Sequence, residues 1–363
     1  MVRPCLTTTS CRSATLNSEK SNTYRSNVVK SIIGVKPVAP QAAAAPHAVP
    51  EVRRVQVDEG SEGQRLDNFL VKLLKGVPKT HVYRVIRSGE VRVNKGRAGA
   101  DTRLALGDEV RVPPVRVADR GDVPAAPARE FPIVFEDEHL LAIDKPAGVA
   151  VHGGSGVSFG VIEQLRRARP QAKLLELVHR LDKETSGLLL VAKKRSALVA
   201  LQDQFRSRET GKTYAALVIG GWPATLKVID VPLRKVLDAA GERRVKTVDE
   251  DDEDGRRSIT LVKVVQAYTD FTLLDVTIKT GRTHQIRVHL ASAGHAIAGD
   301  DKYGDFAFNK ALARGDVVRG CKFDRMFLHA RRLRFLHPAS GEVIELEALL
   351  PAECSRLLAA LRA

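Results

Sequence analysis

Between residues 66 and 93 the apolar side chains recur first with helical and then with strand spacing. A first short helix is predicted by an apolar stripe at positions i, i+3, i+4, i+7 and i+8, which consists of Leu66, Phe69, Leu70, Leu73 and Leu74. A second stripe, which stops at Gly89, consists of Val82, Val85 and Ile86. Alternating residues on both sides of Asn94-Lys95-Gly96 then predict short strands. We therefore expect a small unit of two helices and a few strands over residues 56–112.

Proline separates this unit from the rest of the chain. Five prolines lie within residues 113–132, which predicts a linker over residues 113–130. Beyond it, short runs with strand character recur: Ile133–Phe135, Leu140–Ile143, Leu188–Val191, Tyr214–Ile219, Leu261–Val265 and Phe271–Thr277. Helical stripes are few; one, capped by Ser196, would bury Leu198, Leu201 and Phe205. Strands joined mainly by loops favour an α+β domain over residues 131–363, and not a doubly wound parallel sheet.

The first 50 residues differ from the rest in composition. They are rich in Ser, Thr, Ala and Val, contain a single acid, Glu19, and show no period that could bury a face. This composition predicts a disordered tail over residues 1–55. Scattered basic residues without acids also resemble an organelle transit peptide. Two alternatives explain this composition as well: a dispensable tail, or a start codon that has been placed too early.

The charge of the chain points to a polyanionic partner. It has 58 Lys and Arg against 43 Asp and Glu, a net charge of +15, which favours nucleic acid over a membrane surface. Between residues 71 and 99 a single acid, Glu90, accompanies Lys72, Lys75, Lys79, Arg84, Arg87, Arg92, Lys95 and Arg97. Like charges on one surface repel unless a phosphate backbone neutralises them. We therefore expect this segment to bind RNA or DNA.

The cysteines and the hydropathy exclude other classes of protein. The four cysteines, Cys5, Cys11, Cys321 and Cys354, have no metal-ligand spacing, so neither a disulfide framework nor a zinc site is expected. No apolar run approaches the roughly 20 residues that span a bilayer. We expect a soluble, cytoplasmic protein.

The densest group of reactive side chains lies in residues 179–187, His-Arg-Leu-Asp-Lys-Glu-Thr-Ser-Gly. An apolar run, Leu174–Val178, predicts a strand that leads into this polar turn. Asp182 stands among basic residues whose charge favours a carboxylate, and a positioned carboxylate can act as a nucleophile or a base. The alternative is an Asx-turn, stabilised by Thr185 and Ser186, that has no chemical role.

A second polar segment runs from Gly281 to His289. If it extends a strand, Thr283, Gln285 and Arg287 project to one face, and Arg287 could reach into a cleft and pair with a carboxylate. The alternative is a surface arginine at a sheet edge. The two histidines of the segment have no acid or cysteine at a supporting spacing, so no metal site is expected.

These two segments together resemble the RluA-type family of pseudouridine synthases, and the resemblance covers nearly the whole chain from about residue 55. It is supported by residues 77–79, 91–95, 151–156, 241–245 and 301–304. The basic unit, through residues 63–67 and 84–94, resembles the S4 RNA-binding domain. The resemblance implies a mixed, mostly antiparallel sheet with a cleft, and an isomerase that converts uridine to pseudouridine in RNA, with large-subunit (23S) rRNA as the target. A tRNA enzyme and a non-enzymatic S4-type RNA-binding protein are the alternatives.

The resemblance also implies roles for five side chains. Asp182 would be the catalytic carboxylate, Tyr214 would stack on the target base, and Arg287 would pair with Asp182. Arg180 would enter the RNA as the uridine leaves its stack, and Leu328 would form the apolar wall of the pocket. The residues expected to contact RNA through the S4-like unit are Lys79, Arg84, Arg87, Arg92 and Lys95.

Physical reasoning is consistent with those residue types. Flipping a uridine out of folded RNA costs a few kcal/mol, and stacking on an aromatic ring returns about 1–3 kcal/mol per base. Breaking the N1–C1′ bond, turning the base and rejoining it through C5 needs one carboxylate and a dry pocket. No cofactor, no metal and no obligate protein partner are expected, and the chain is expected to act as a monomer. A glycoside hydrolase would need a second carboxylate, for which only Glu184 is near in sequence.

Overall fold

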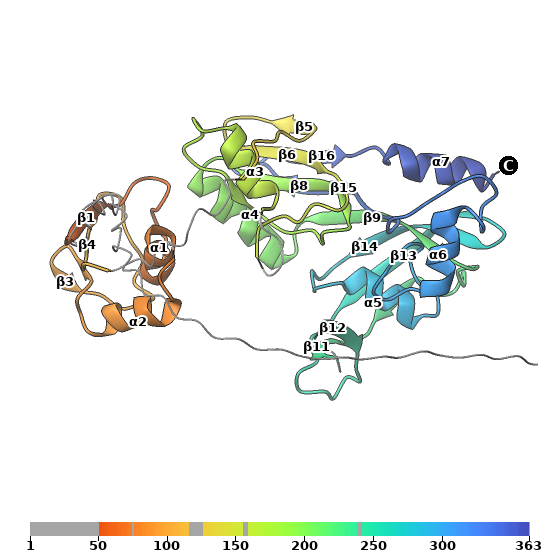
Figure 1. The fold of residues 1–363 in the computed structure, drawn as a ribbon, viewed down its shortest axis with the longest axis horizontal. Coiled ribbons are helices and arrows are strands. Elements are labelled where there is room, and N and C mark those ends of the chain that lie inside the picture. The colour runs from red at the N-terminus through yellow and green to blue at the C-terminus, as the bar shows by residue number, and fades with distance from the viewer. Residues whose placement is uncertain (1–50, 75, 116–125, 155–158, 239–241, 363) are drawn as a thin grey trace, which may run out of the picture. The chain divides into compact units, whose positions relative to one another are not determined.

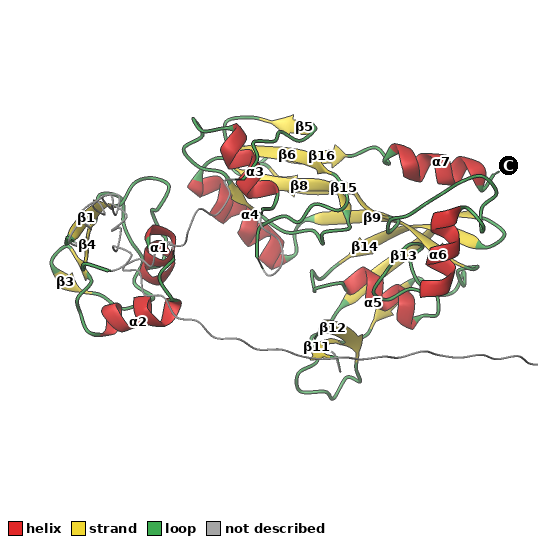
Figure 2. Cartoon of the chain, in the orientation of Figure 1, coloured by secondary structure: helices red, strands yellow, loops and turns green. Residues whose placement is uncertain are grey.

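The computed structural model describes residues 51–74, 76–115, 126–154, 159–238 and 242–362. Residues 1–50 of the tail predicted over residues 1–55 lie outside the described residues, as do Lys75 and the middle of the predicted linker, residues 116–125. The described chain contains both helices and strands, and runs of successive strands are joined by loops, as the α+β prediction requires (Figure 1, Figure 2).

The N-terminal unit has the predicted two helices and short strands. Its elements are β1 (Arg53–Gln56), α1 (Leu66–Leu73), α2 (Lys79–Arg87), β2 (Arg92–Val93), β3 (Gly96–Arg97) and β4 (Glu109–Val112). The strands form an antiparallel sheet in the order β1-β4-β2-β3, and both apolar stripes are buried against it. Strand β1 pairs with β4, and its first three residues, 53–55, belong to the segment that was predicted as tail.

The C-terminal part is built on one large sheet. Its strand order is β10 (Val228–Asp230), β13 (Ile259–Ala267), β14 (Phe271–Ile278), β9 (Gly211–Ile219), β15 (Leu328–Leu336), β8 (Ser186–Ala192), β6 (Leu140–Lys145) and β5 (Ile133–Glu136). Strand β16 (Val343–Glu347) pairs with β15, and β7 (Glu176–Leu177) pairs with β8. Every pairing is antiparallel except that of β15 with β8. The mixed, mostly antiparallel sheet is therefore confirmed, although the run Leu174–Val178 contributes only the two residues of β7.

Helices cover both faces of this sheet, and they are α3 (Val161–Ala168), α4 (Arg195–Ser207), α5 (Gln285–Ser292), α6 (Phe306–Arg314) and α7 (Ala352–Ala360). Odd-numbered residues of β6 and β8 pack against α3, and even-numbered ones pack against α4. Both faces of β8 are covered, which explains why its sequence is uniformly apolar after Gly187. The predicted helix around Leu198 and Leu201 is present, but Ser196 lies in its first turn and does not cap it.

A two-stranded hairpin, β11 (Leu233–Leu237) and β12 (Arg243–Thr247), stands apart from the large sheet. Leu233 and Val245 on its inner face pack against Val288 of α5 and against Tyr303. The hairpin is thereby attached to the same helix that carries Arg287.

Gly187 lies where β8 and β15 run parallel, opposite Ala330. Its φ is +108°, and a Cβ at this position would lie 2.3 Å from the carbonyl oxygen of Ala330. This close approach brings Leu328 and the turn around Asp182 to the same end of the sheet.

We predict that Gly187→Ala lowers the free energy of unfolding by about 1–3 kcal/mol or more, because the backbone of β15 must move away. Urea denaturation measures the change. The matched control is Gly221→Ala, where a Cβ would meet open space, and a change within about 0.5 kcal/mol is expected there. Equal effects of the two substitutions would contradict the close-approach argument.

Candidate active site

One cavity of about 480 Å³ is lined by all five side chains for which the sequence predicted a role in catalysis or base binding: Arg180, Asp182, Tyr214, Arg287 and Leu328. They come from distant parts of the chain. The sheet brings them together because β14, β9, β15 and β8 are consecutive neighbours. A cavity of this size is in the range that holds small organic ligands.

The turn that carries Asp182 is anchored by the histidine that precedes it. His179 Nε2 accepts a hydrogen bond from the Leu190 N–H at 3.1 Å, and its ring stacks on Phe205 at 4.6 Å between centroids. Burial lowers the pKa of His179 to about 3, so the ring is neutral and can accept that bond. His179 therefore fixes the turn to β8, and its nitrogen is not available for proton transfer.

A buried lysine supports the same turn from the other side. Lys145 is fully buried, and its Nζ donates to the carbonyls of Pro146 (2.8 Å), Val149 (2.8 Å) and Lys183 (3.1 Å). Burial lowers its pKa to about 7, with Glu184 opposing the shift. The bond to Lys183 holds the residue directly after Asp182.

The structure does not form the Asx-turn that was the alternative for Asp182. The Thr185 N–H closes the turn by donating to the backbone carbonyl of Asp182 at 3.1 Å. Ser186 Oγ is instead 2.9 Å from His329 Nδ1 and accepts from Arg325 at 2.8 Å. The carboxylate of Asp182 is turned toward positively charged and N–H groups in the cavity.

Arg287 is the charged group nearest to that carboxylate. Its Nη1 lies 3.9 Å from Asp182 Oδ2, and its side chain is only 5% exposed. Asp300, itself 1% exposed, binds the other edge of the guanidinium, with Nε–Oδ2 at 2.7 Å and Nη2–Oδ1 at 2.6 Å. Such a bidentate pair fixes the plane of the guanidinium and leaves Nη1 directed at Asp182.

The charge of Asp300 is secured by its hydrogen bonds. Burial favours the neutral carboxyl, but the bonds from Arg287 and from the N–H groups of Tyr303 and Lys302 outweigh it and lower the pKa of Asp300. The buried pair is therefore ionic. Without Asp300, the buried guanidinium would keep only the largely exposed Asp301, 3.4 Å away, and Asp182, 3.9 Å away, as counter-charges.

The segment from Gly281 to His289 is a loop followed by helix α5, so the prediction of a strand was wrong. The Gln285 side chain explains the change of structure. Its Oε1 accepts from Thr280 Oγ1 (2.7 Å) and from the Arg282 N–H (3.1 Å), which closes a turn directly after β14. His284 then adopts a left-handed conformation, φ 52° and ψ 20°, at the start of the helix. Arg287 reaches the cavity from a helix and not from a strand.

Tyr214 and Leu328 contribute to the apolar lining of the cavity. Tyr214 lies on β9; burial raises the pKa of its hydroxyl, and the nearby Asp182 carboxylate adds to the shift. Leu328 is the first residue of β15, is 3% exposed, and lies opposite Ala216 in the sheet. Arg180 is exposed at the cavity, and among the described residues no carboxylate pairs with it.

Sequence reasoning missed three residues of this cluster: Asp300, Tyr303 and His284. His284 Nε2 lies 3.9 Å from Asp182 Oδ2, the same distance as Arg287 Nη1. The ring of Tyr303 lies beneath the Arg287 guanidinium, with 5.1 Å from Cζ to the ring centroid. Tyr303 lies within the stretch 301–304 that supported the family resemblance, and Asp300 directly precedes it, but only the fold shows that both contact Arg287.

The described residues contain no group of three or more His, Cys, Asp or Glu side chains arranged to hold a metal ion. Within the same residues, no helix combines the length and the apolar character needed to cross a bilayer.

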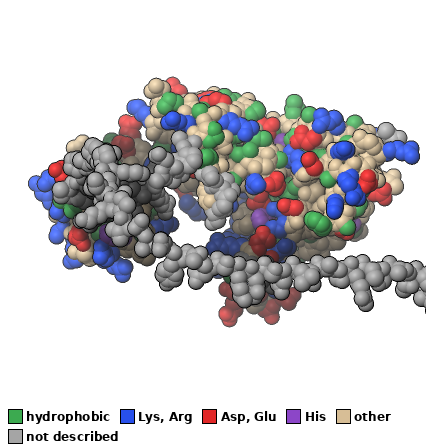
Figure 3. Space-filling view, in the orientation of Figure 1, with side chains coloured by type: hydrophobic (Ala, Val, Ile, Leu, Met, Phe, Trp, Pro, Cys, Tyr) green, Lys and Arg blue, Asp and Glu red, His purple; other side chains and the backbone are tan. Residues whose placement is uncertain are grey.

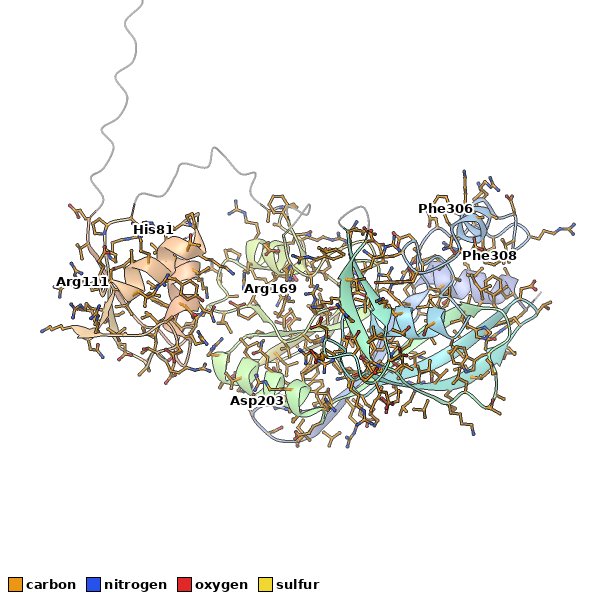
Figure 4. The ribbon with its side chains drawn as sticks, turned by 90° about the horizontal axis from the view of Figure 1, so that it is seen from below. His81, Arg111, Arg169, Asp203, Phe306 and Phe308 are labelled. Atoms are coloured by element: carbon orange, nitrogen blue, oxygen red, sulfur yellow. The ribbon has the colours of Figure 1, made fainter. Side chains whose placement is uncertain are left out.

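The basic residues of the N-terminal unit form a second candidate site. Lys79, Arg84, Arg87 and Lys95 are exposed and Arg92 is half-buried. Arg84 lies beside His81, which Figure 4 labels, and Figure 3 shows Lys and Arg side chains on the visible surface of this unit. Over the described part of the chain, no ion pair joins any of these five side chains to a carboxylate. Unneutralised cations on one small unit are what a phosphate backbone binds.

We predict that Asp300→Asn lowers the free energy of unfolding at neutral pH by about 3–5 kcal/mol, because it removes the buried carboxylate that pairs with Arg287 through two short bonds. The folded-state pKa of Asp300 is depressed, so the stability due to its charge is present above the unfolded pKa and is lost as pH falls through the folded one. The difference between wild type and variant should therefore shrink in acid. Denaturation curves at several pH values test this, and a difference that stays constant with pH would contradict it.

Comparison with known proteins identifies the family of the chain. Residues 139–292 match the model of the RNA pseudouridylate synthase family, and residues 64–110 match that of the S4 domain. The chain is 49% identical over 319 residues to ribosomal large subunit pseudouridine synthase C of Escherichia coli (strain K12), which covers 86% of this chain and 98% of that protein. The protein of the same name from Haemophilus influenzae is 48% identical over 317 residues, covering 86% and 95%.

A solved structure shares the fold. Human RNA Pseudouridylate Synthase Domain Containing 4 superposes with a TM-score of 0.52 at 27% identity, over 64% of this chain and 93% of that one. Sequence and structure agree on one family. This chain belongs to the RNA pseudouridine synthases, and it carries an S4 domain at its N-terminal side.

Proposed function

We propose that this enzyme isomerises selected uridines of large-subunit ribosomal RNA to pseudouridine, with Asp182 as the catalytic carboxylate. The observation that carries the assignment of Asp182 is its place in the cavity, with Oδ2 3.9 Å from the buried guanidinium of Arg287. The target RNA is inferred from the printed names of relatives that align over nearly their whole length. RNA is the partner, and we propose that the chain acts as a cytoplasmic monomer.

The first step in this proposal is extrusion of the uridine. The glycosidic bond is inaccessible inside folded RNA, so the nucleotide must leave its stack at a cost of a few kcal/mol. Tyr214 offers an aromatic face inside the cavity, and stacking on such a face returns about 1–3 kcal/mol per base. The exposed guanidinium of Arg180 at the cavity opening is placed to occupy the space that the base vacates.

The second step is the transfer of the base from N1 to C5. The N1–C1′ bond breaks, the uracil turns, and a C5–C1′ bond forms, while the proton on C5 moves to N1. Asp182 can serve by adding to the ribose, by adding to the base or by abstracting a proton, and each path requires its carboxylate beside the glycosidic bond. Leu328 and Tyr214 retain the freed uracil in an apolar space, which prevents its loss to solvent.

We also propose separate tasks for the two folded parts. The S4 unit, from β1 to β4, binds RNA phosphates through Lys79, Arg84, Arg87, Arg92 and Lys95. The domain over residues 131–363 performs the isomerisation. Phosphate contacts position a protein on RNA without reading its bases, so choice of the uridine falls to the catalytic domain and to RNA shape.

We predict that Asp182→Asn abolishes pseudouridine formation and keeps RNA binding, because the amide retains the shape but not the charge or basicity of the carboxylate. The gene is deleted, and one of the two variants is expressed in its place. Pseudouridine is then counted in large-subunit rRNA and in tRNA from these cells. Asp203→Asn, on the exposed face of α4 (Figure 4), is the matched control and should restore full modification. Modification that survives Asp182→Asn would refute the assignment, and loss confined to tRNA would refute the rRNA target.

We predict that replacing Arg84, Arg87 and Arg92 by Gln weakens RNA affinity and lowers the slope of log K against log salt by roughly 0.7–0.9 for each lost contact. The control variant loses the same charge in the catalytic domain, where Gln replaces the exposed residues Arg319, Arg356 and Arg362. Binding is measured by titration of an rRNA fragment at several salt concentrations. An unchanged slope in the first variant would show that this face does not contact phosphate.

A further inference from the structure

Tyr303 connects the hairpin β11–β12 to the two groups that face Asp182. Its hydroxyl oxygen accepts a hydrogen bond from the Val245 N–H at 3.1 Å and lies 2.7 Å from His284 Nδ1. Its ring packs beneath the guanidinium of Arg287 and meets the His284 ring edge-on, at 5.5 Å between centroids. One side chain therefore contacts both neighbours of the catalytic carboxylate.

The direction of these hydrogen bonds follows from what each group can donate. A backbone N–H only donates, so the Tyr303 oxygen is the acceptor from Val245, and its single proton is free for His284. When that proton is donated to Nδ1, Nδ1 is the unprotonated nitrogen and the proton of the neutral ring resides on Nε2; with the other tautomer, the Tyr303 proton would have no protein acceptor among the described residues. Burial lowers the pKa of His284; Arg287 and Lys302 act in the same sense, and Asp182 and Asp300 oppose it. The neutral ring with Nε2–H is the form that fits this environment.

That Nε2–H faces the carboxylate that the proposed function assigns to catalysis. The distance from Nε2 to Asp182 Oδ2 is 3.9 Å, longer than a hydrogen bond. Hydrogen bonds in active sites are often long in the free enzyme and tighten when substrate binds. His289, the other histidine of this helix, has both ring nitrogens engaged, with Thr260 Oγ1 at 2.8 Å and the Val231 carbonyl at 3.0 Å.

The backbone of His284 also sets it apart. Its φ of 52° is a left-handed conformation that non-glycine residues seldom adopt, and such residues gather at functional sites. This conformation directs the imidazole into the cavity at the first turn of α5. The Gln285 bonds described above sustain it.

We propose that His284 and Tyr303 are positioning residues for the isomerisation. When RNA is bound, His284 Nε2–H donates to Asp182 Oδ2 and, together with Arg287, holds that oxygen so that Oδ1 faces the ribose. Tyr303 keeps the His284 proton on Nε2 and takes its own position from the backbone of β12. This inference rests on the proposed role of Asp182, and it names two residues that orient the Asp182 carboxylate for that role.

The test compares single-turnover rates of pseudouridine formation and RNA dissociation constants for a set of variants. His284→Ala should slow the reaction about 10–100-fold, as is typical for loss of a group that orients a reactive one, with the RNA dissociation constant unchanged. His284→Gln should recover most of the rate, because its amide N–H lies near the position of Nε2–H. Tyr303→Phe should slow the reaction about tenfold, because the tautomer of His284 is no longer fixed.

The decisive variant is the double substitution His284→Gln with Tyr303→Phe. Glutamine has no tautomers, so removing the Tyr303 hydroxyl should have no further effect on the rate in that background. If the loss from Tyr303→Phe is the same with histidine and with glutamine, Tyr303 only supports the hairpin, and the inference is overturned. A His284→Gln enzyme as slow as His284→Ala, or a His284→Ala enzyme as fast as wild type, overturns it as well.

Controls separate this inference from the proposed function and from misfolding. Tyr268→Phe removes a hydroxyl that is buried with no hydrogen-bond partner among the described residues, and it should leave the rate unchanged. Thermal unfolding of every variant shows whether it is folded. Wild type and Asp182→Asn are assayed beside them: a wild type that forms no pseudouridine would refute the proposed function, whereas normal wild-type activity with insensitive His284 variants would refute only this inference.

Discussion

The buried guanidinium of Arg287 is the charge around which the catalytic cavity is organised. Removing an ion from water costs several kcal/mol even after a protein relaxes around it, and only a well-placed counter-charge offsets that cost. Asp300 provides the counter-charge through two short bonds, and its Oδ1 also accepts from the N–H groups of Lys302 and Tyr303. The one edge of the guanidinium that Asp300 leaves free is directed at Asp182. The carboxylate for which we propose a catalytic role is thus positioned beside a buried ion pair, Arg287 with Asp300.

The sheet supplies the rest of the geometry. Strand β15 lies between β9 and β8, so Tyr214, Leu328 and the turn after β7 meet at one place although they are far apart in sequence. The turn itself is secured by two groups whose pKa values burial lowers, the neutral His179 and Lys145. His179, which belongs to the reactive segment of the sequence, therefore serves with Lys145 to hold the turn that carries Asp182. The carboxylate of Asp182 faces the cavity.

Local periodicity predicted most of the framework, because a helix or strand that buries one face must repeat its apolar residues at a fixed spacing. The stripe through Leu66 and Leu70 and the six strand-like runs were found where they were expected. The segment around Arg287 was misassigned because its structure is set by side-chain bonds of Gln285 to Thr280 and Arg282, which leave no periodic signal. Asp300 and Tyr303 could not be found from spacing, since their contacts with Arg287 exist only once α5 and the following turn are folded.

The central claim is that Asp182 and Arg287 act together on an extruded uridine, and the most direct measurement is a crystal structure of the Asp182→Asn enzyme bound to its RNA target. The account predicts a uridine outside the RNA stack, its base against Tyr214, with residue 182 in contact with the ribose and Arg287 still paired with Asp300. A uridine that remains stacked in the RNA, or one bound away from residue 182, would contradict it.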